Sequence, residues 1–184
     1  MKLAAHQPNL IPWMPLIHKI AASDVFVLMG HCQFEKNGFQ NRFRLRVGSP
    51  WHTMSVRHGK EPIIRKKYVR PKEDWDKIKF SLLEYPILNE FDPFIKESLW
   101  ETNVGIILKI VELLKIKTPI HFDWQTQLRG TERLAAICKE FNADTYLGGS
   151  STSKYMEPEV FRAAGIKIEQ QTYGDKRHVL EVLK

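Results

Sequence analysis

The chain has 184 residues, 43% of them hydrophobic and 11% aromatic, which is enough for a sizeable core and predicts one domain spanning residues 1–184. A mean hydropathy of −0.34 and the lack of any run of ~18 apolar residues exclude a membrane channel, and only two cysteines, Cys32 and Cys138, exclude a disulfide framework. The formal charge of +7 is concentrated in residues 36–79, which carry +9, whereas the rest of the chain carries −2. Because the first residues are too polar for a signal peptide, we expect a cytoplasmic protein with no membrane partner.

The first predicted element is a short strand over residues 2–5, which leads into the sequence His6-Gln7-Pro8-Asn9. Ligand sites in α/β sheets lie beyond the carboxyl ends of strands, and a histidine there can act as a general base. A histidine that only holds a turn by hydrogen bonding is the alternative. A helix opened by Pro15 follows, and the apolar run over residues 25–29 predicts a buried strand.

Residues 33–56 alternate in part between apolar residues and arginine, which predicts an N-terminal β-hairpin insertion with one half-buried face. Its first ten residues hold a dense polar set: Gln33, Lys36, Asn37, Gln40, Asn41 and Arg42. Amide and guanidinium groups at this density can make several directed hydrogen bonds to a carboxylate or a phosphate. An exposed hairpin without a ligand explains the set nearly as well.

A basic loop follows the hairpin, where Gly59 and Pro62 indicate exposed backbone. Since unpaired buried charges are costly, its basic residues are expected to face solvent or a polyanion. The residues that we expect to bind nucleic acid are Arg57, Arg65, Lys66, Lys67 and Arg70. A solvated basic surface without a partner is the alternative.

Helical and strand-like patterns alternate through the rest of the chain. The predicted helices span residues 72–83, 104–114, 132–141 and 157–164, and the predicted strands span residues 120–122, 144–147 and 166–171. Thr102 and Thr131 are the expected N-caps of the second and third of these helices. Such alternation predicts an α/β fold with a largely parallel sheet and flanking helices.

A glycine-rich loop connects the strand over residues 144–147 with the next helix, and it reads Gly148, Gly149, Ser150, Ser151, Thr152, Ser153 and Lys154. Glycines allow several backbone amides to point at one anion, and the hydroxyls and the lysine add donors. The spacing is not that of a P-loop, and a flexible turn is the alternative. Neither a cofactor motif nor the spacing of a metal site is present, so we expect no cofactor and no metal.

Several of these motifs together resemble the WbqC-like protein family. The matching segments are His6-Gln7-Pro8-Asn9-Leu10-Ile11-Pro12-Trp13, Lys19-Ile20, Gln33-Phe34, Lys36-Asn37, Gln40-Asn41-Arg42, Thr131-Glu132-Arg133-Leu134 and Tyr146-Leu147-Gly148-Gly149. One departure is Gly30-His31-Cys32, where the family commonly has acidic residues. The resemblance implies a transferase-like protein, since the family often accompanies surface-polysaccharide genes, and a related context is the modification of phage DNA.

We therefore expect a transferase that joins a small amine-bearing substrate, such as an amino acid, to a phosphate-activated acceptor. The positive charge of residues 36–79 favours a modified base in phage DNA as this acceptor. His6 is the expected base, and Arg42, Lys36 and the loop Gly148–Lys154 are expected to stabilise the leaving phosphate. Gln7, Asn9, Gln33, Asn37 and Asn41 are expected to orient the substrate. A glycosyl- or aminoacyl-type transferase of O-antigen synthesis and a noncatalytic nucleic-acid-binding module remain alternatives. In each transferase reading His6, Gln7, Asn37, Arg42 and Lys154 converge on one pocket.

Overall fold

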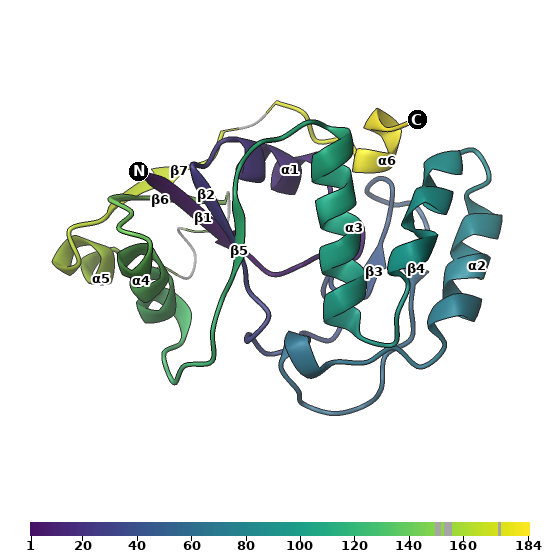
Figure 1. Ribbon diagram of the computed structural model, residues 1–184, viewed down its shortest axis with the longest axis horizontal. Coiled ribbons are helices and arrows are strands. Elements are labelled where there is room, and N and C mark those ends of the chain that lie inside the picture. Colours follow the sequence, from purple (N-terminus) through teal and green to yellow (C-terminus); the bar gives the residue numbers. More distant parts are fainter. Residues whose placement is uncertain (150–151, 153–155, 173) are drawn as a thin grey trace.

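The computed structural model describes residues 1–149, 152, 156–172 and 174–184. Its centre is a sheet of five strands in the order β5-β2-β1-β6-β7 (Figure 1). The strands are β1 (Lys2–His6), β2 (Val25–Leu28), β5 (Ile120–Phe122), β6 (Thr145–Gly148) and β7 (Lys167–Gln170). Every neighbouring pair in this sheet is parallel. The predicted α/β fold with a parallel sheet is therefore confirmed.

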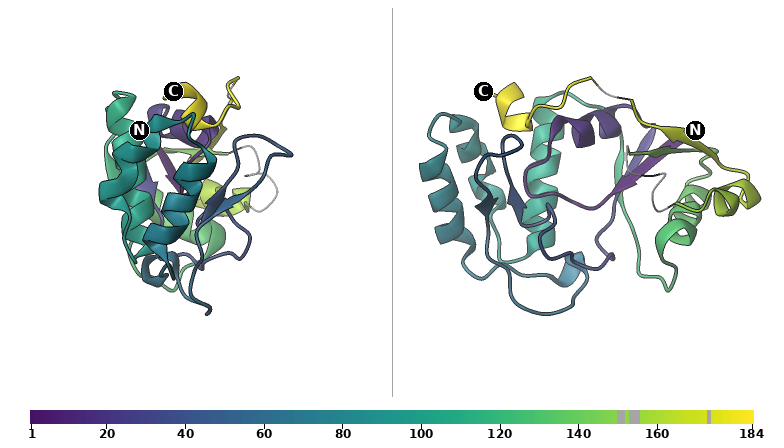
Figure 2. Two further views of the ribbon diagram at one scale, coloured as in Figure 1. Left: turned by 90° about the vertical axis from the view of Figure 1, so that its right-hand side faces the viewer. Right: turned by 180° about the vertical axis from the view of Figure 1, so that it is seen from behind.

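Helices cover both faces of the sheet. The described helices are α1 (Met14–Ala21), α2 (Pro71–Ser81), α3 (Leu99–Leu113), α4 (Gly130–Glu140), α5 (Pro158–Ala163) and α6 (Val179–Val182), with 3₁₀ helices η1 (Ile63–Arg65) and η2 (Pro86–Phe94), and α2 packs on β4 rather than on this sheet. Figures 1 and 2 place α4 and α5 on one side of the sheet, and α1 and α3 on the other. In the part of the chain that is described, no helix combines the length and the apolar character needed to cross a bilayer.

The sheet separates two hydrophobic clusters, because successive side chains of a strand point to opposite faces. Leu3 and Ala5 of β1 pack in the cluster that contains residues of α4 and α5, whereas Ala4 packs in the cluster that contains residues of α1 and α3. Both faces of the middle of β1 are thus buried, which explains the apolar run Leu3-Ala4-Ala5.

The predicted helix caps are wrong in detail. Helix α3, which corresponds to the predicted helix over residues 104–114, begins at Leu99. Its N-cap is Ser98, whose side chain accepts a hydrogen bond from the Glu101 amide. Thr102 lies one turn inside the helix and bonds to Lys96 instead. Thr131 also lies inside its helix, and its hydroxyl accepts a hydrogen bond from the Glu157 amide. Thr102 thus binds the segment just before its helix and Thr131 binds the start of α5, and a local capping pattern reveals neither contact.

Regular strand pairing in the segment 33–56 is much shorter than the sequence predicts. Strand β3 (Arg42–Phe43) pairs antiparallel with β4 (His52–Thr53), which makes a two-stranded sheet of its own. The alternation over the segment is only partial, and the segment also contacts other elements, since the Leu10 amide after β1 donates to the Phe39 carbonyl and β4 packs on α2.

The buried His178 at the start of α6 is expected to make the stability of the fold depend on pH. Its ring is fully buried, Nε2 donates to the Ile11 carbonyl at 3.3 Å, and Nδ1 accepts from the Leu180 amide at 3.4 Å. The neutral ring satisfies both groups, and a second proton would face the Leu180 N–H. Burial is the largest cause that lowers the pKa of His178 from 6.5 to about 4.

The unfolded chain therefore binds more protons than the folded one between pH 6.5 and about 4, so stability is complete above pH 6.5 and is lost as the pH falls through this window. The loss attributable to His178 is about 3 kcal/mol at its limit. Urea unfolding of wild type and His178→Gln at several pH values measures it. We expect the variant to be less stable at pH 7.5 and to lose less stability than the wild type as the pH falls. An equal loss of stability in the two proteins would contradict the role of His178.

Candidate active site

Two adjoining cavities open where the strands of the sheet reach their carboxyl ends. The first, which we call the arginine cavity, has a volume of about 460 Å³ and is lined by residues that include Arg65, Arg129 and Arg133. The second, the β1 cavity, has a volume of about 420 Å³ and is lined by the end of β1 and by Tyr146 of β6. Cys32, Gly130 and Arg133 line both cavities.

The β1 cavity lies at the switch point of the sheet. Strand β1 leads through α1 to β2 on one side, whereas its other neighbour, β6, belongs to the second half of the chain. The connections on either side of such a point run in opposite directions, which leaves a crevice outside the carboxyl ends of the two strands. Open α/β sheets bind their ligands at this position.

His6 ends β1 and lines the β1 cavity. Its Nδ1 donates to the Gln7 carbonyl at 2.7 Å, so Nε2 carries the lone pair. Burial, followed by the charge of Lys19, lowers the pKa of His6 from 6.5 to about 4. The ring is therefore neutral at pH 7 and accepts hydrogen bonds, but it is a weak proton acceptor. Lys19 lies buried beneath it, and its ammonium donates to the Ala5 carbonyl at 3.0 Å.

A buried polar network fixes the loop that follows His6. The Gln7 side-chain oxygen accepts from the Gln40 amide at 2.5 Å. The Asn103 side chain of α3 donates to the carbonyls of Pro8 and Gln40, at 3.0 and 2.6 Å, and the Tyr68 hydroxyl donates to Asn103 at 2.9 Å. These bonds hold Gln7 at the cavity through two other segments of the chain.

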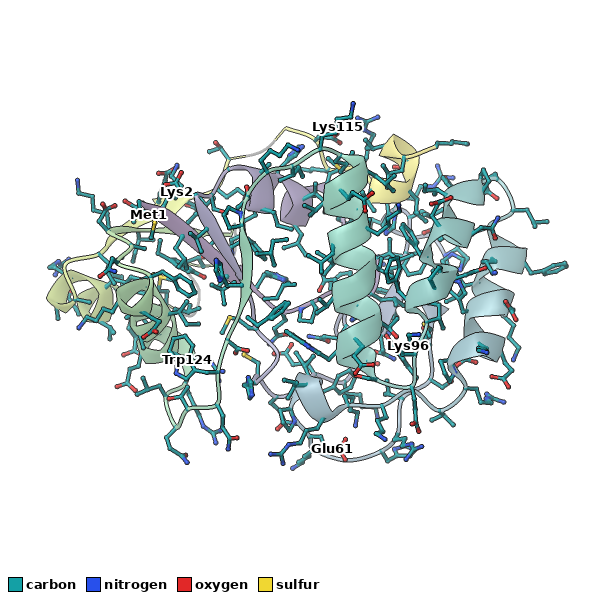
Figure 3. The ribbon with its side chains drawn as sticks, viewed as in Figure 1. Met1, Lys2, Glu61, Lys96, Lys115 and Trp124 are labelled. Atoms are coloured by element: carbon teal, nitrogen blue, oxygen red, sulfur yellow. The ribbon has the colours of Figure 1, made fainter. Side chains whose placement is uncertain are left out.

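Asp123, directly after β5, organises the arginine cavity. Its carboxylate is buried and accepts from the Gly30 amide at 2.7 Å, from the His31 amide at 3.2 Å and from the Arg133 guanidinium at 2.5 Å. The His31 ring lies with Nδ1 3.1 Å from the same carboxylate. Arg133 also donates to the carbonyl of Trp124, which Figure 3 labels beside α4. One carboxylate thereby joins the ends of β2 and β5 to helix α4.

Positive charge and free donors line the arginine cavity. Arg65 and Arg129 are exposed at its rim, and Arg133 has a buried Nε with no hydrogen-bond partner among the described residues. Helix α4 begins at this cavity, and no side chain caps its first amides. Gly130 has a φ of +50° and no neighbour within 4 Å of an added Cβ. This arrangement suits a phosphate or a carboxylate.

The Cys32 thiol lies where the two cavities meet. Burial raises the pKa of Cys32, while the charge of Arg133 acts in the opposite direction. The group is therefore a thiol at neutral pH, and it contributes a weak donor to the wall between the cavities.

The structure brings together only part of the predicted site. His6 and Gln7 line the β1 cavity, and Gln33 lines the arginine cavity. The other predicted residues of the polar set, Lys36, Asn37, Asn41 and Arg42, line neither cavity, and the same holds for Asn9. Ser150, Ser151 and Lys154 lie outside the described residues, so the predicted convergence on Lys154 stays a prediction.

The polar set makes contacts of its own. Arg42 stacks over the Trp51 ring at 4.0 Å and donates to the Asn37 carbonyl, and Asn41 donates to the Met54 carbonyl at 2.9 Å. Gly148 packs closely on Thr152, because an added Cβ would lie 2.5 Å from the threonine hydroxyl. The roles expected for Lys36 and Arg42 at a leaving phosphate stay predictions, and the cavities themselves offer other arginines for this task.

The expectation that the basic loop is fully exposed is wrong for Lys66. Its side chain is buried, and the ammonium donates to the Gly59 carbonyl at 2.9 Å and lies 3.8 Å from Glu61. These partners offset the free-energy cost of burying an unpaired charge, which was the reason to expect an exposed side chain. Arg57 and Lys67 are exposed but both pair with Glu97. Arg65 and Arg70 are exposed.

Sequence reasoning missed three central residues of the cavities, namely Cys32, Asp123 and Arg133. A signal existed for Asp123, because it directly follows the predicted strand over residues 120–122, as His6 follows the first strand. Arg133 lies in a segment that resembles the family, but nothing marked it as a cavity residue, since a charged residue near a helix start is usually solvated.

The fold and the cavities define an α/β protein with a ligand crevice at the carboxyl edge of its sheet. A sequence model of the WbqC-like protein family matches residues 7–178, and the chain belongs to this family. The Uncharacterized protein Rv1507c of Mycobacterium tuberculosis (strain ATCC 25618 / H37Rv) is similar, with 28% identity over 199 residues that cover 96% of this chain and 84% of the relative. No solved structure shows a significant match.

Proposed function

We propose that the protein is a transferase that joins a small amine-bearing substrate, such as an amino acid, to a phosphate-activated acceptor. The observation that carries this proposal is the arginine cavity, where Arg65, Arg129 and the uncapped start of α4 surround a space of about 460 Å³. Donors preorganised around an anion stabilise the charge that develops on a departing phosphate.

The adjoining β1 cavity provides the place for the amine. His6 offers the lone pair of Nε2, and the Gln7 side-chain oxygen, which accepts one hydrogen bond from Gln40, has a second lone pair, so an amino group can be oriented by acceptors on two sides. The nitrogen then attacks the activated carbon, the new C–N bond forms, and the C–O bond to the phosphate breaks. The bonding electrons leave with the phosphate oxygen, and a proton must leave the nitrogen.

A modified base in DNA is the acceptor that the charge distribution favours. Residues 36–79 carry +9, and Arg65 and Arg70 in this stretch are exposed, with Arg65 at the rim of the arginine cavity. A DNA strand that passes over this rim can contact both guanidinium groups while its base enters the cavity.

The DNA proposal predicts a salt effect. Replacing Arg65 and Arg70 together by glutamine is expected to weaken duplex DNA binding and to reduce the slope of log K against log salt by ~0.9 for each lost phosphate contact. Fluorescence anisotropy at several salt concentrations measures the slope. Arg162→Gln, an exposed arginine on α5 that pairs with Glu159, is the matched control and should leave the slope unchanged. An unchanged slope in the double variant would contradict the DNA proposal.

A nucleotide-linked precursor of a surface polysaccharide is the second candidate acceptor. The observation in its favour is that three of the five basic residues expected at a polymer are already engaged, Lys66 by burial and Arg57 and Lys67 by Glu97. A small precursor needs contacts with the cavity arginines only, and none with the basic residues outside the cavity. Amine-dependent release of phosphate from activated DNA or from a nucleotide-linked sugar, measured side by side, separates the two acceptors. No release from either would contradict the transferase proposal.

A further inference from the structure

The proton that leaves the attacking amine needs an acceptor, and besides His6 in the β1 cavity the adjoining arginine cavity contains one. His31 lines this cavity, and its side chain is 23% exposed. Its Nδ1 lies 3.1 Å from Oδ1 of Asp123, whose side chain is 1% exposed. A carboxylate accepts and cannot donate, so Nδ1 carries the hydrogen and Nε2 carries the lone pair.

Asp123 has three further partners besides the His31 ring. The amides of Gly30 and His31 donate to it, and Arg133 forms an ion pair with it. An ionised carboxylate behind an imidazole fixes the ring tautomer and stabilises the imidazolium that forms when Nε2 takes a proton. Besides Asp123 at its Nδ1, the charged and titratable groups that line the cavity with His31 are Cys32, Arg65, Arg129 and Arg133.

The two histidines of the crevice, His6 and His31, differ in the group that accepts the hydrogen bond from Nδ1. His6 has only a neutral carbonyl behind its Nδ1 and the positive charge of Lys19 nearby, so its surroundings disfavour a second proton. His31 has a buried carboxylate in the same position. The first ring is suited to orient a substrate, and the second is suited to exchange a proton with it.

From this geometry we propose that His31, held by Asp123, is the residue that takes the proton from the amine. The inference rests on the proposed transferase function. In the balanced step, the amine nitrogen forms the C–N bond, the phosphate leaves with the electrons of the C–O bond, and one N–H proton passes to Nε2 of His31. The proton then leaves the imidazolium to water, which restores the neutral ring.

The ring tautomers test the geometry without an activity assay. In ¹⁵N-histidine-labelled full-length protein at pH 8, long-range ¹H–¹⁵N correlation is expected to show His31 with the hydrogen on Nδ1. His178, which donates through Nε2, is the internal control with the opposite tautomer. His31→Gln assigns the signal. Asp123→Asn is expected to remove the Nδ1–H preference, because an amide can donate to Nδ1 instead. An Nε2–H tautomer of His31 in the wild type would overturn the proposal.

Kinetics test the step itself. With the activated acceptor and the amine as substrates, His31→Gln is expected to lower kcat by ~10²–10⁴-fold, and the matched variant His6→Gln by much less. Free imidazole is expected to restore part of the activity of His31→Ala, which a purely structural role of the ring does not explain. Unfolding midpoints of the variants should match the wild type.

The outcomes separate this inference from the function on which it rests. An active His31→Gln variant, or the lack of rescue by imidazole in a folded His31→Ala variant, overturns the role of His31 alone. Absence of amine-dependent phosphate release from the wild type overturns the transferase proposal and the proton step with it, whatever tautomer His31 has.

Discussion

Replacing Arg133 by methionine is expected to lower the free energy of unfolding by ~3–5 kcal/mol. The side chains of Arg133 and Asp123 are 8% and 1% exposed, and their closest atoms are 2.5 Å apart. The variant keeps most of the side-chain volume but leaves the Asp123 carboxylate buried with only two backbone amides and the His31 ring as partners. The cost is that of a buried charge without its counterion.

Urea unfolding at pH 7.5 measures this loss. Arg162→Met is the matched control, because its ion pair with Glu159 is fully exposed at the surface of α5 and should contribute less than ~1 kcal/mol. Equal losses in the two variants would show that the Asp123–Arg133 pair does not organise the cavity. The result would also remove the support for the orientation of His31.

The second large effect is expected at the rim of the arginine cavity. Replacing Arg65 and Arg129 together by glutamine should lower kcat/KM for the phosphate-activated acceptor by ~10²–10³-fold, since charged donors at a departing phosphate act mainly in the transition state. Both side chains are exposed, so the fold should be unaffected. Steady-state kinetics of phosphate release measure the change.

The control for this experiment is a pair of basic residues that lies away from the cavity. Arg57 and Lys67 carry the same total charge, but both pair with Glu97 and neither lines the cavity. Replacing both by glutamine should leave kcat/KM for a small acceptor nearly unchanged. A loss as large as that of the rim variant would indicate that overall charge, rather than the cavity, governs the reaction.

The alternation of helices and strands predicted the parallel sheet well, because the inner strands β2, β1 and β6 have short apolar runs that are easy to recognise. β1, β2, β5, β6 and β7 all lie close to the predicted ranges. The segment 33–56 was harder to predict, since bonds from distant segments help to hold it, such as that from the Leu10 amide to the Phe39 carbonyl. The 3₁₀ helix over Pro86–Phe94 was missed for a similar reason, as short helices depend on their packing.

The site could be predicted where one strand alone positions a residue. His6 and Gln7 follow β1, and the rule that ligands bind at carboxyl ends placed them correctly at a cavity. The arginine cavity depends instead on a pair, Asp123 and Arg133, that joins two elements in three dimensions. Burial of Lys66 likewise depends on the Gly59 carbonyl, a partner that a count of charges does not reveal.

Titration with inorganic pyrophosphate tests the central claim, which is that the arginine cavity binds the phosphate of the substrate. Amide ¹H–¹⁵N spectra of the wild type are expected to show saturable, one-to-one changes that are largest at Gly130 and Thr131 at the start of α4, and the changes should vanish in the variant with Arg65 and Arg129 replaced by glutamine. Shifts confined to exposed basic residues outside the cavity, such as Arg57 and Lys67, or shifts that do not saturate, would contradict the claim.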